Sequence, residues 1–214
     1  MIILIASNKG GSGKTTLATN LATCFAVKGG KEVCLVDADK QASAAKWILE
    51  REVAKHTPNI TCVQKYDNLQ PTLTSLASKY EIVIVDVAGR NSREMITAMA
   101  VADYVISPVQ CSQLDLDTLM ELNDQVVRVK DLNPNINVKL CHVMASTNST
   151  VKDKEQKEFR EYIEEFSDLK HLNSVIYYRK IYRDVMSEGK SVIESTNEQA
   201  HSEVQKIYEE VFNG

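Results

Sequence analysis

Short apolar runs alternate with longer amphipathic segments along the chain. Polar residues do not alternate within these runs, which is typical of strands buried on both faces of a parallel sheet. The pattern predicts strands at residues 2–6, 33–36, 60–63, 82–85, 104–109 and 138–144.

Several other segments of the chain have apolar residues at helical spacing. Apolar residues recur every three or four positions in residues 15–27, 114–132 and 198–212, which predicts amphipathic helices there. Strands that alternate with helices along a whole chain indicate an α/β fold, with a doubly wound, mostly parallel sheet flanked by helices. Ligands of such sheets bind at the carboxyl ends of the strands.

Length and charge narrow the class of protein. The chain has 214 residues, enough for one sizeable core, so we expect a single domain over residues 1–214. The formal net charge of −4 argues against a protein that coats nucleic acid through bulk positive charge, but it leaves room for a local basic patch.

The lack of a targeting segment and the cysteine pattern favour a cytoplasmic location. No basic segment precedes the first apolar run, and no run approaches the roughly 18 residues that span a bilayer. The five cysteines are odd in number, widely spaced and without a CxxC pair. We therefore expect neither a disulfide framework nor a cysteine metal site.

The stretch SNKGGSGKTT follows the first apolar run directly. Its glycines let the backbone curl so that N–H groups face an anion, and the helix that follows adds its positive dipole end. Lys14 then reaches the β- and γ-phosphates of a nucleotide, and the Thr15 hydroxyl binds Mg²⁺. The alternative is a tight strand-to-helix turn without a ligand. The expected nucleotide-binding residues are Gly10, Gly11, Ser12, Gly13, Lys14, Thr15 and Thr16.

One position departs from the usual phosphate-loop pattern. Asn8 stands where G-x-x-x-x-G-K-[ST] has its first glycine, and Lys9 precedes the glycine pair. Residues 9–16 instead resemble the deviant Walker A motif, K-G-G-x-G-K-[ST]-[ST], of the ParA/MinD family of ATPases. The resemblance implies ATP as the nucleotide and a homodimer in which Lys9 reaches the phosphates of the other subunit. A positive charge supplied in trans stabilises developing phosphate charge. The alternative is a solvated loop lysine.

Acidic residues follow two further apolar runs. Asp37 and Asp39 end the second strand, and Asp86 ends the YEIVIVD segment as a Walker B carboxylate would. Carboxylates near a phosphate site hold Mg²⁺ and orient water. The resemblance assigns Asp39 to the hydrolytic water and Asp37, with Thr15 and Asp86, to the metal, although Lys40 replaces the family's proline. The alternative for Asp37 and Asp39 is capping of the next helix. The expected catalytic residues are Lys9, Lys14 and Asp39.

Three further loops receive roles from the resemblance alone. Gly89 would bring a backbone amide to the γ-phosphate as part of a switch loop. The segment that holds Pro108, Cys111 and Asp115 would lie near the dimer seam and the base pocket. The choice of ATP over GTP rests on the resemblance, because residues 146–148 show only a blurred adenine-binding pattern.

Residues 177–194 resemble a segment of small plasmid-partition ATPases, YYRKIYRDVMSEGKSVIE in this chain. These proteins bind DNA without sequence preference once ATP has dimerised them. Residues 170–190 carry five basic and two acidic residues, a local charge of +3 in an acidic chain. Contacts between basic side chains and DNA phosphates weaken steeply as the salt concentration rises. The alternative is a solvated helical face. The candidate DNA contacts are Arg179, Lys180, Arg183 and Lys190.

The resemblance implies a Mg²⁺-dependent ATP hydrolase that segregates a plasmid or chromosome. ATP would dimerise it on nucleoid DNA, and a centromere- or cargo-binding partner would stimulate hydrolysis and release. The chain starts at its first strand, so we expect no operator-binding domain before it. The alternative is a MinD-like membrane-associated or protein-cargo positioning ATPase. We expect no membrane partner, because Glu203, Glu209 and Glu210 on the last helix would repel anionic lipid. A metabolic or redox relative would need cluster cysteines.

Overall fold

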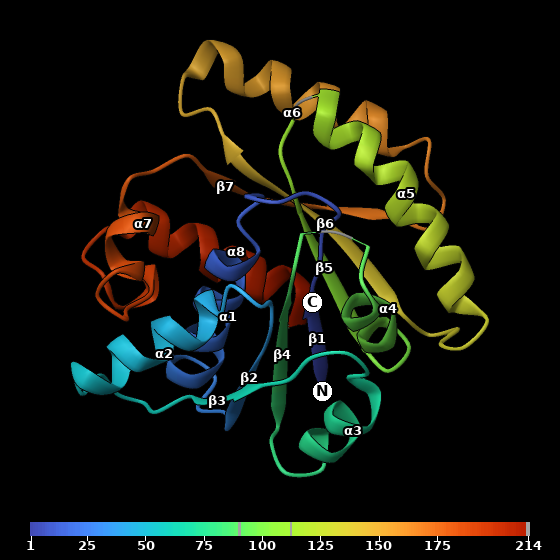
Figure 1. The fold of residues 1–214 in the computed structure, drawn as a ribbon. Coiled ribbons are helices and arrows are strands. Elements are labelled where there is room, and N and C mark those ends of the chain that lie inside the picture. Colours follow the sequence, from blue (N-terminus) through green and yellow to red (C-terminus); the bar gives the residue numbers. More distant parts are fainter. Residues whose placement is uncertain (90, 112, 213–214) are drawn as a thin grey trace.

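The computed structural model describes residues 1–89, 91–111 and 113–212, without the side chains of 113–117 and 149. Seven strands in this part of the chain form one sheet in the order β3-β2-β4-β1-β5-β6-β7 (Figure 1). Every pair of neighbours is parallel, which confirms the predicted fold class. The strands are β1 Ile2–Ile5, β2 Val33–Ala38, β3 Thr61–Gln64, β4 Ile82–Val87, β5 Tyr104–Val109, β6 Asn137–Ala145 and β7 Lys170–Tyr177.

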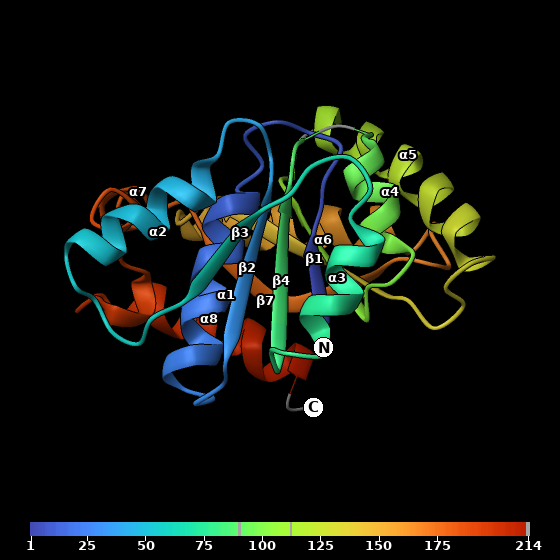
Figure 2. The same cartoon turned by 60° about the horizontal axis from the view of Figure 1, so that its bottom comes forward.

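Helices cover both faces of the sheet (Figures 1 and 2). The buried residues form two clusters, one on each side. One cluster includes residues of α1, α2, α7 and α8, and the other includes residues of α3, α4, α5 and α6. The helices are α1 Lys14–Val27, α2 Ser43–Val53, α3 Gln70–Ala77, α4 Arg93–Met99, α5 Gln113–Lys130, α6 Ser149–Ile163, α7 Ile181–Met186 and α8 Glu198–Phe212, with a 3₁₀ turn at Val192–Glu194.

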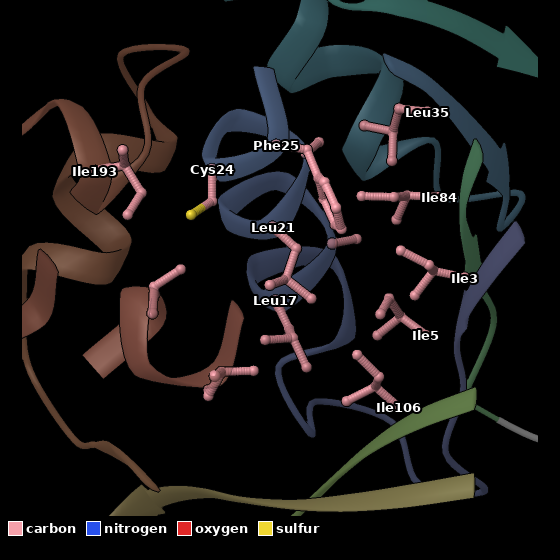
Figure 3. Close-up of a cluster of buried hydrophobic side chains, with 14 of the residues drawn as sticks. Ile3, Ile5, Leu17, Leu21, Cys24, Phe25, Leu35, Ile84, Ile106 and Ile193 are labelled. Carbon is pink, nitrogen blue, oxygen red and sulfur yellow. The ribbon is translucent and has the colours of Figure 1, made fainter. Parts of the chain in front are cut away.

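The central strand β1 shows why its apolar run is continuous. Ile3 and Ile5 belong to the cluster beneath α1, whereas Ile2 and Leu4 belong to the cluster on the opposite face. Successive side chains of a strand point to opposite faces, so a strand covered on both faces needs apolar residues throughout. Figure 3 shows Ile3 and Ile5 directed toward Leu17 of α1. This packing fixes the loop that leaves β1 and enters α1.

Strand β7 was not predicted, because His171, Asn173 and Ser174 interrupt its apolar pattern. Its pairing with β6 is irregular, with two shifts of register. The backbone amides of Asn173 and Ser174 donate instead to the Glu210 carboxylate of α8, at 2.7 and 2.8 Å. The Glu210 side chain of α8 therefore supplies the acceptors for two backbone amides of this edge strand.

One residue of the last helix does not lie on the polar face that was expected. Glu203 is only 7% exposed and belongs to the interior, so its assignment to a lipid-repelling surface was wrong. No helix in the described part of the chain combines the length and the apolar character that crossing a bilayer requires.

Candidate functional site

The glycine loop connects the carboxyl end of β1 to the first turn of α1. Gly11 and Gly13 have φ values of 71° and 86°, a left-handed conformation that favours glycine. Gly13 is the N-cap of α1, and no side chain caps the helix. The first turn holds no acidic residue either. Its amides and dipole end therefore remain available to an anion.

A cavity of about 530 Å³ opens over this loop. All of residues 10–16 line it, which brings the seven predicted nucleotide-binding residues together. Asp39 lines it from the β2–α2 loop, and Gly89 lines it from the loop after β4. The carboxyl ends of three neighbouring strands, β1, β2 and β4, thus deliver residues to one cavity.

Lys14 is a largely buried residue of the loop that lines the cavity. The residue is 7% exposed, and its Nζ donates to the Lys9 carbonyl oxygen at 2.9 Å. Burial lowers the pKa of Lys14, while Asp86 and Asp39 raise it in partial compensation. A desolvated ammonium that donates to a neutral carbonyl oxygen is suited to an incoming phosphate. Lys9 itself does not line the cavity of its own chain.

Thr15 and Asp86 meet as the sequence predicted for a metal site. The Thr15 hydroxyl donates to Oδ2 of Asp86 at 2.6 Å. Asp86 is 1% exposed, and its Oδ1 has no hydrogen-bond partner among the described residues. Burial raises the pKa of Asp86 to about 7. A buried carboxylate with one free oxygen beside a hydroxyl fits a divalent cation, which supplies the missing positive charge.

Asp37 has a structural function that the metal prediction did not include. It lies inside β2, paired in register with Asp86 of β4. Its Oδ2 accepts from the Ala45 amide at 2.8 Å and its Oδ1 accepts from the Asp39 amide at 3.1 Å. Burial raises the pKa of Asp37, and these amide hydrogen bonds lower it. Asp37 therefore caps the start of α2, as the capping alternative proposed, and its metal role remains a prediction.

An apolar pocket of about 100 Å³ adjoins the phosphate-loop cavity. The two share Gly13, Thr16 and Met144. The sequence showed only a blurred adenine-binding pattern at residues 146–148, which do not line this pocket, and the segment after β7 was assigned to DNA. The remaining lining residues are Leu17, Val143, Ile176, Tyr177, Tyr178, Arg179, Tyr182 and Arg183. Aromatic residues around the basic ones were the signal that could have indicated a pocket at this place.

The four candidate DNA contacts fall into two groups. The Arg179 side chain is 23% exposed, and its Nε donates to the buried Glu203 at 2.7 Å. Lys180, Arg183 and Lys190 are more exposed. Lys180 pairs with Asp184 and Lys190 with Glu188, while Arg183 lies over the Tyr178 ring. Exposed pairs of this kind are weak and exchange readily for a phosphate.

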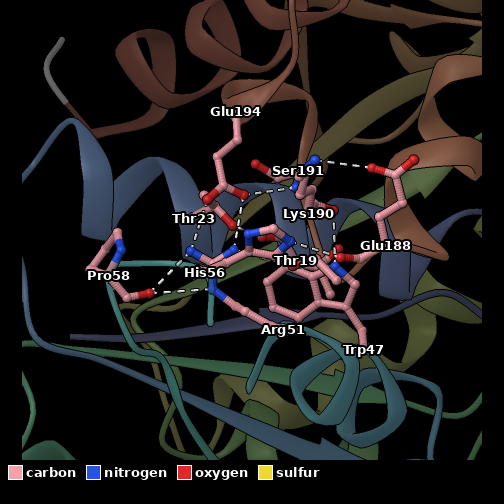
Figure 4. A network of polar contacts seen from close by, with 11 residues as sticks. Thr19, Thr23, Trp47, Arg51, His56, Pro58, Glu188, Lys190, Ser191 and Glu194 are labelled. Carbon is pink, nitrogen blue, oxygen red and sulfur yellow. Dashed lines mark hydrogen bonds and ion pairs between the residues drawn. The ribbon is translucent and has the colours of Figure 1, made fainter. Parts of the chain in front are cut away.

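The GKSVIE part of the C-terminal motif joins α1 to α2 (Figure 4). Glu194 accepts from both terminal nitrogens of the buried Arg51 of α2, each at 2.9 Å. The Val192 amide donates to Asn20 of α1 at 2.9 Å. The Trp47 indole of α2 donates to the Lys190 carbonyl oxygen. This segment therefore fixes the helix of the phosphate loop relative to the helix that follows Asp39.

The loop after β5 remains a prediction as a dimer seam. Pro108 lies within β5, and the half-buried Cys111 contacts the Glu155 carbonyl oxygen of α6. The side chain of Asp115 lies outside those described. Among the described residues of this loop, none lines either cavity.

Comparisons with known proteins agree with this site. A family model described as the CobQ/CobB/MinD/ParA nucleotide binding domain matches residues 3–192. The chain is 29% identical over 174 residues to "Chromosome partitioning protein ParA" of Myxococcus xanthus, covering 63% of this chain and 61% of that protein. It is 34% identical over 127 residues to "Maintenance of carboxysome distribution protein A" of Gloeobacter kilaueensis, covering 56% and 54%. These alignments thus span less than two thirds of either relative.

A solved structure with the same fold is the putative plasmid partition protein of Borrelia burgdorferi bound to AMPPNP. It superposes with a TM-score of 0.75 at 22% identity, over 97% of this chain and 96% of that one. At this identity the likeness concerns the fold.

Proposed function

This chain belongs to the CobQ/CobB/MinD/ParA nucleotide-binding domain family, and we propose that it is a Mg²⁺-dependent ATP hydrolase that partitions DNA. ATP binding dimerises the chain, and the dimer binds duplex DNA without sequence preference. Hydrolysis, stimulated by a centromere- or cargo-binding partner, releases it. The observation that carries the proposal is the single cavity into which the glycine loop, Lys14, Thr15 and Asp39 converge beside Asp86.

Each group of residues in and beside this cavity has its own role in ATP hydrolysis. The amides of residues 10–16 and the Lys14 ammonium hold the phosphates. Thr15 and Asp86 are the residues that would hold Mg²⁺, whose chemistry is to neutralise charge on the phosphate oxygens. Asp39, held by the Gln41 amide at 3.0 Å, orients the attacking water. Lys9, supplied by the other subunit, stabilises the charge that develops on the transferred group.

The DNA-binding part of the proposal rests on the exposed cations that follow β7 in the sequence. Lys180, Arg183 and Lys190 supply phosphate contacts, and two copies in a dimer double their number. The carboxylate partners of Lys180 and Lys190 are weakly bound and give way to a polyanion. Arg179 is less available to DNA in this conformation, because Glu203 holds it at the apolar pocket.

A second candidate function is the positioning of a protein cargo. The observation in its favour is the similarity to a protein named for carboxysome distribution. Both functions use the same ATP-driven dimer, so the attached partner distinguishes them.

The test measures binding of an arbitrary duplex DNA with ATP, with ADP and without nucleotide, with anionic liposomes in parallel. Lys14→Ala serves as the nucleotide-binding control. We expect binding to DNA with ATP only, and we expect it to weaken steeply as salt rises. Equal DNA binding in all three nucleotide states, or ATP-dependent binding to liposomes and not to DNA, would contradict the proposal.

A further inference from the structure

Glu203 of α8 is a buried carboxylate that accepts hydrogen bonds from three donors. Its Oε1 accepts from Arg179 Nε at 2.7 Å. Its Oε2 accepts from the Tyr182 hydroxyl at 2.9 Å and from the Tyr177 backbone amide at 3.2 Å. At 7% exposure, the negative charge is tolerated because a guanidinium and two neutral donors surround it.

All three donors belong to residues that line the apolar pocket beside the phosphate loop. Glu203 does not line the pocket itself, so it holds one wall from behind. A second residue of α8 supports the same wall, since Arg179 Nη1 donates to Gln199 Oε1 at 2.7 Å. The wall therefore depends on α8, which lies far from the phosphate loop in the sequence.

We propose that Glu203 is a positioning residue for the base of the bound nucleotide. It fixes Tyr177, Arg179 and Tyr182 so that the pocket next to Gly13 and Thr16 accepts a flat heteroaromatic ring. The inference rests on the proposed binding of ATP. Replacing one carboxylate oxygen by an NH2 group removes the charge that pairs with Arg179 and leaves one acceptor oxygen for the three donors.

The chain provides a matched control on the same helix. Glu210 also accepts two backbone amides of β7, those of Asn173 and Ser174. Neither residue lines the pocket. If these carboxylates only joined α8 to β7, substitutions at the two positions would therefore change nucleotide binding in the same way.

The experiment compares Glu203→Gln and Glu210→Gln with the natural chain. Calorimetry measures the affinities for ATP, ADP and inorganic tripolyphosphate in the presence of Mg²⁺. Tripolyphosphate fills the phosphate loop but has no base. We expect Glu203→Gln to weaken ATP and ADP binding about tenfold, equivalent to about 1.4 kcal/mol, with tripolyphosphate binding unchanged. We expect Glu210→Gln to change none of the three.

Two results would overturn the inference. One is an unchanged affinity of Glu203→Gln for ATP, and the other is an equal loss for ATP and tripolyphosphate. If Glu203→Gln does not fold, Tyr182→Phe tests the same wall, because it keeps the ring and removes the hydroxyl donor. An unchanged ratio of ATP to tripolyphosphate affinity in Tyr182→Phe would then overturn the inference. Failure of the natural chain to bind ATP would overturn the proposed function as well.

Discussion

Gly89 lies directly against the Lys9–Gly10 peptide. A Cβ atom at position 89 would stand 2.6 Å from the Gly10 amide nitrogen and closer still to the Lys9 carbonyl oxygen. Real Cβ atoms do not approach backbone atoms this closely. The loop after β4 and the loop that carries Lys9 therefore touch at a place where only glycine fits.

This contact predicts the effect of Gly89→Ala. The added methyl group must displace one of the two loops, and overpacking of this kind costs about 1–3 kcal/mol. We expect a lower free energy of unfolding, measured in urea, together with weaker nucleotide binding. Gly10→Ala is the control for stability, since no heavy atom of the described residues lies within 4 Å of a Cβ at that position. Equal stability of the two variants would contradict the contact.

Lys9→Ala tests the role of the lysine in trans. We expect nearly unchanged binding of ATP to the monomer, because Lys9 does not line the cavity of its own chain and its carbonyl contact to Lys14 is a backbone feature. Dimerisation on ATP and partner-stimulated hydrolysis should both be lost. Sedimentation with and without ATP measures the dimer, and Lys28→Ala at the exposed end of α1 is the control. Dimerisation that survives in Lys9→Ala would remove the proposed function of this lysine.

Asp39→Ala should separate binding from hydrolysis. The side chain lines the cavity, and its loss removes the group that orients water, worth roughly 10²–10⁴ in rate. We expect ATP binding and ATP-dependent DNA binding to persist while phosphate release falls by about that factor. Phosphate release is followed with a coupled assay, and Asp131→Ala on the surface provides the comparison. A hydrolysis rate within a few-fold of the natural chain would assign the water to another residue.

The Arg51–Glu194 pair should contribute much more to stability than an exposed pair. Arg51 is 2% exposed and Glu194 is 16% exposed. Removing one partner leaves an uncompensated buried charge, which costs about 3–5 kcal/mol. We expect Arg51→Met to lower the free energy of unfolding by about this amount, and we expect Arg51→Met combined with Glu194→Met to recover part of it.

The control for that experiment is Lys31→Ala, which breaks the exposed pair between Lys31 and Glu81. Solvent screens this pair, so we expect a much smaller change in urea unfolding. A loss as large as that of Arg51→Met would contradict the argument from burial.

His142 should make the fold sensitive to mild acid. Its ring is 2% exposed, stacks on Phe159 at 4.7 Å, and has no hydrogen-bond partner at Nδ1 among the described residues. Burial lowers the pKa of His142, and Glu155 raises it in partial opposition. The unfolded chain then binds a proton at higher pH than the folded chain. Stability is therefore present above pH 6.5, the ordinary pKa of the ring, and declines as the pH falls below that value.

His142→Phe removes the titrating group and keeps an aromatic ring against Phe159. Urea unfolding at several pH values between about 7.5 and 5 measures the effect, which is limited to about 1.4 kcal/mol per pH unit for one proton. We expect the natural chain to lose more stability than His142→Phe over this range. Parallel losses would show that His142 does not contribute to acid sensitivity.

Local features of the fold and site were predictable from the sequence. The apolar runs identified six of the seven strands, because a strand covered on both faces needs uninterrupted apolar residues. The phosphate loop was readable because its chemistry comes from consecutive residues: backbone amides, Gly13, Lys14 and Thr15. Asp86 was readable because it ends a buried strand. These are properties of a few neighbouring residues, so sequence spacing describes them.

Contacts between distant segments were decided by the tertiary structure. Asp37, predicted at a metal, also accepts hydrogen bonds from the Asp39 amide in the β2–α2 loop and from the Ala45 amide in the first turn of α2. Arg179, a predicted DNA contact, and Glu203, which was expected on the surface, pair with each other, and Glu203 is buried. The sequence by itself determined a phosphate loop at the end of a parallel sheet. Only the packing of segments distant in the sequence, such as α8 against β7, decided which charges are buried and paired, because the free energy of a charge depends on the groups folded around it.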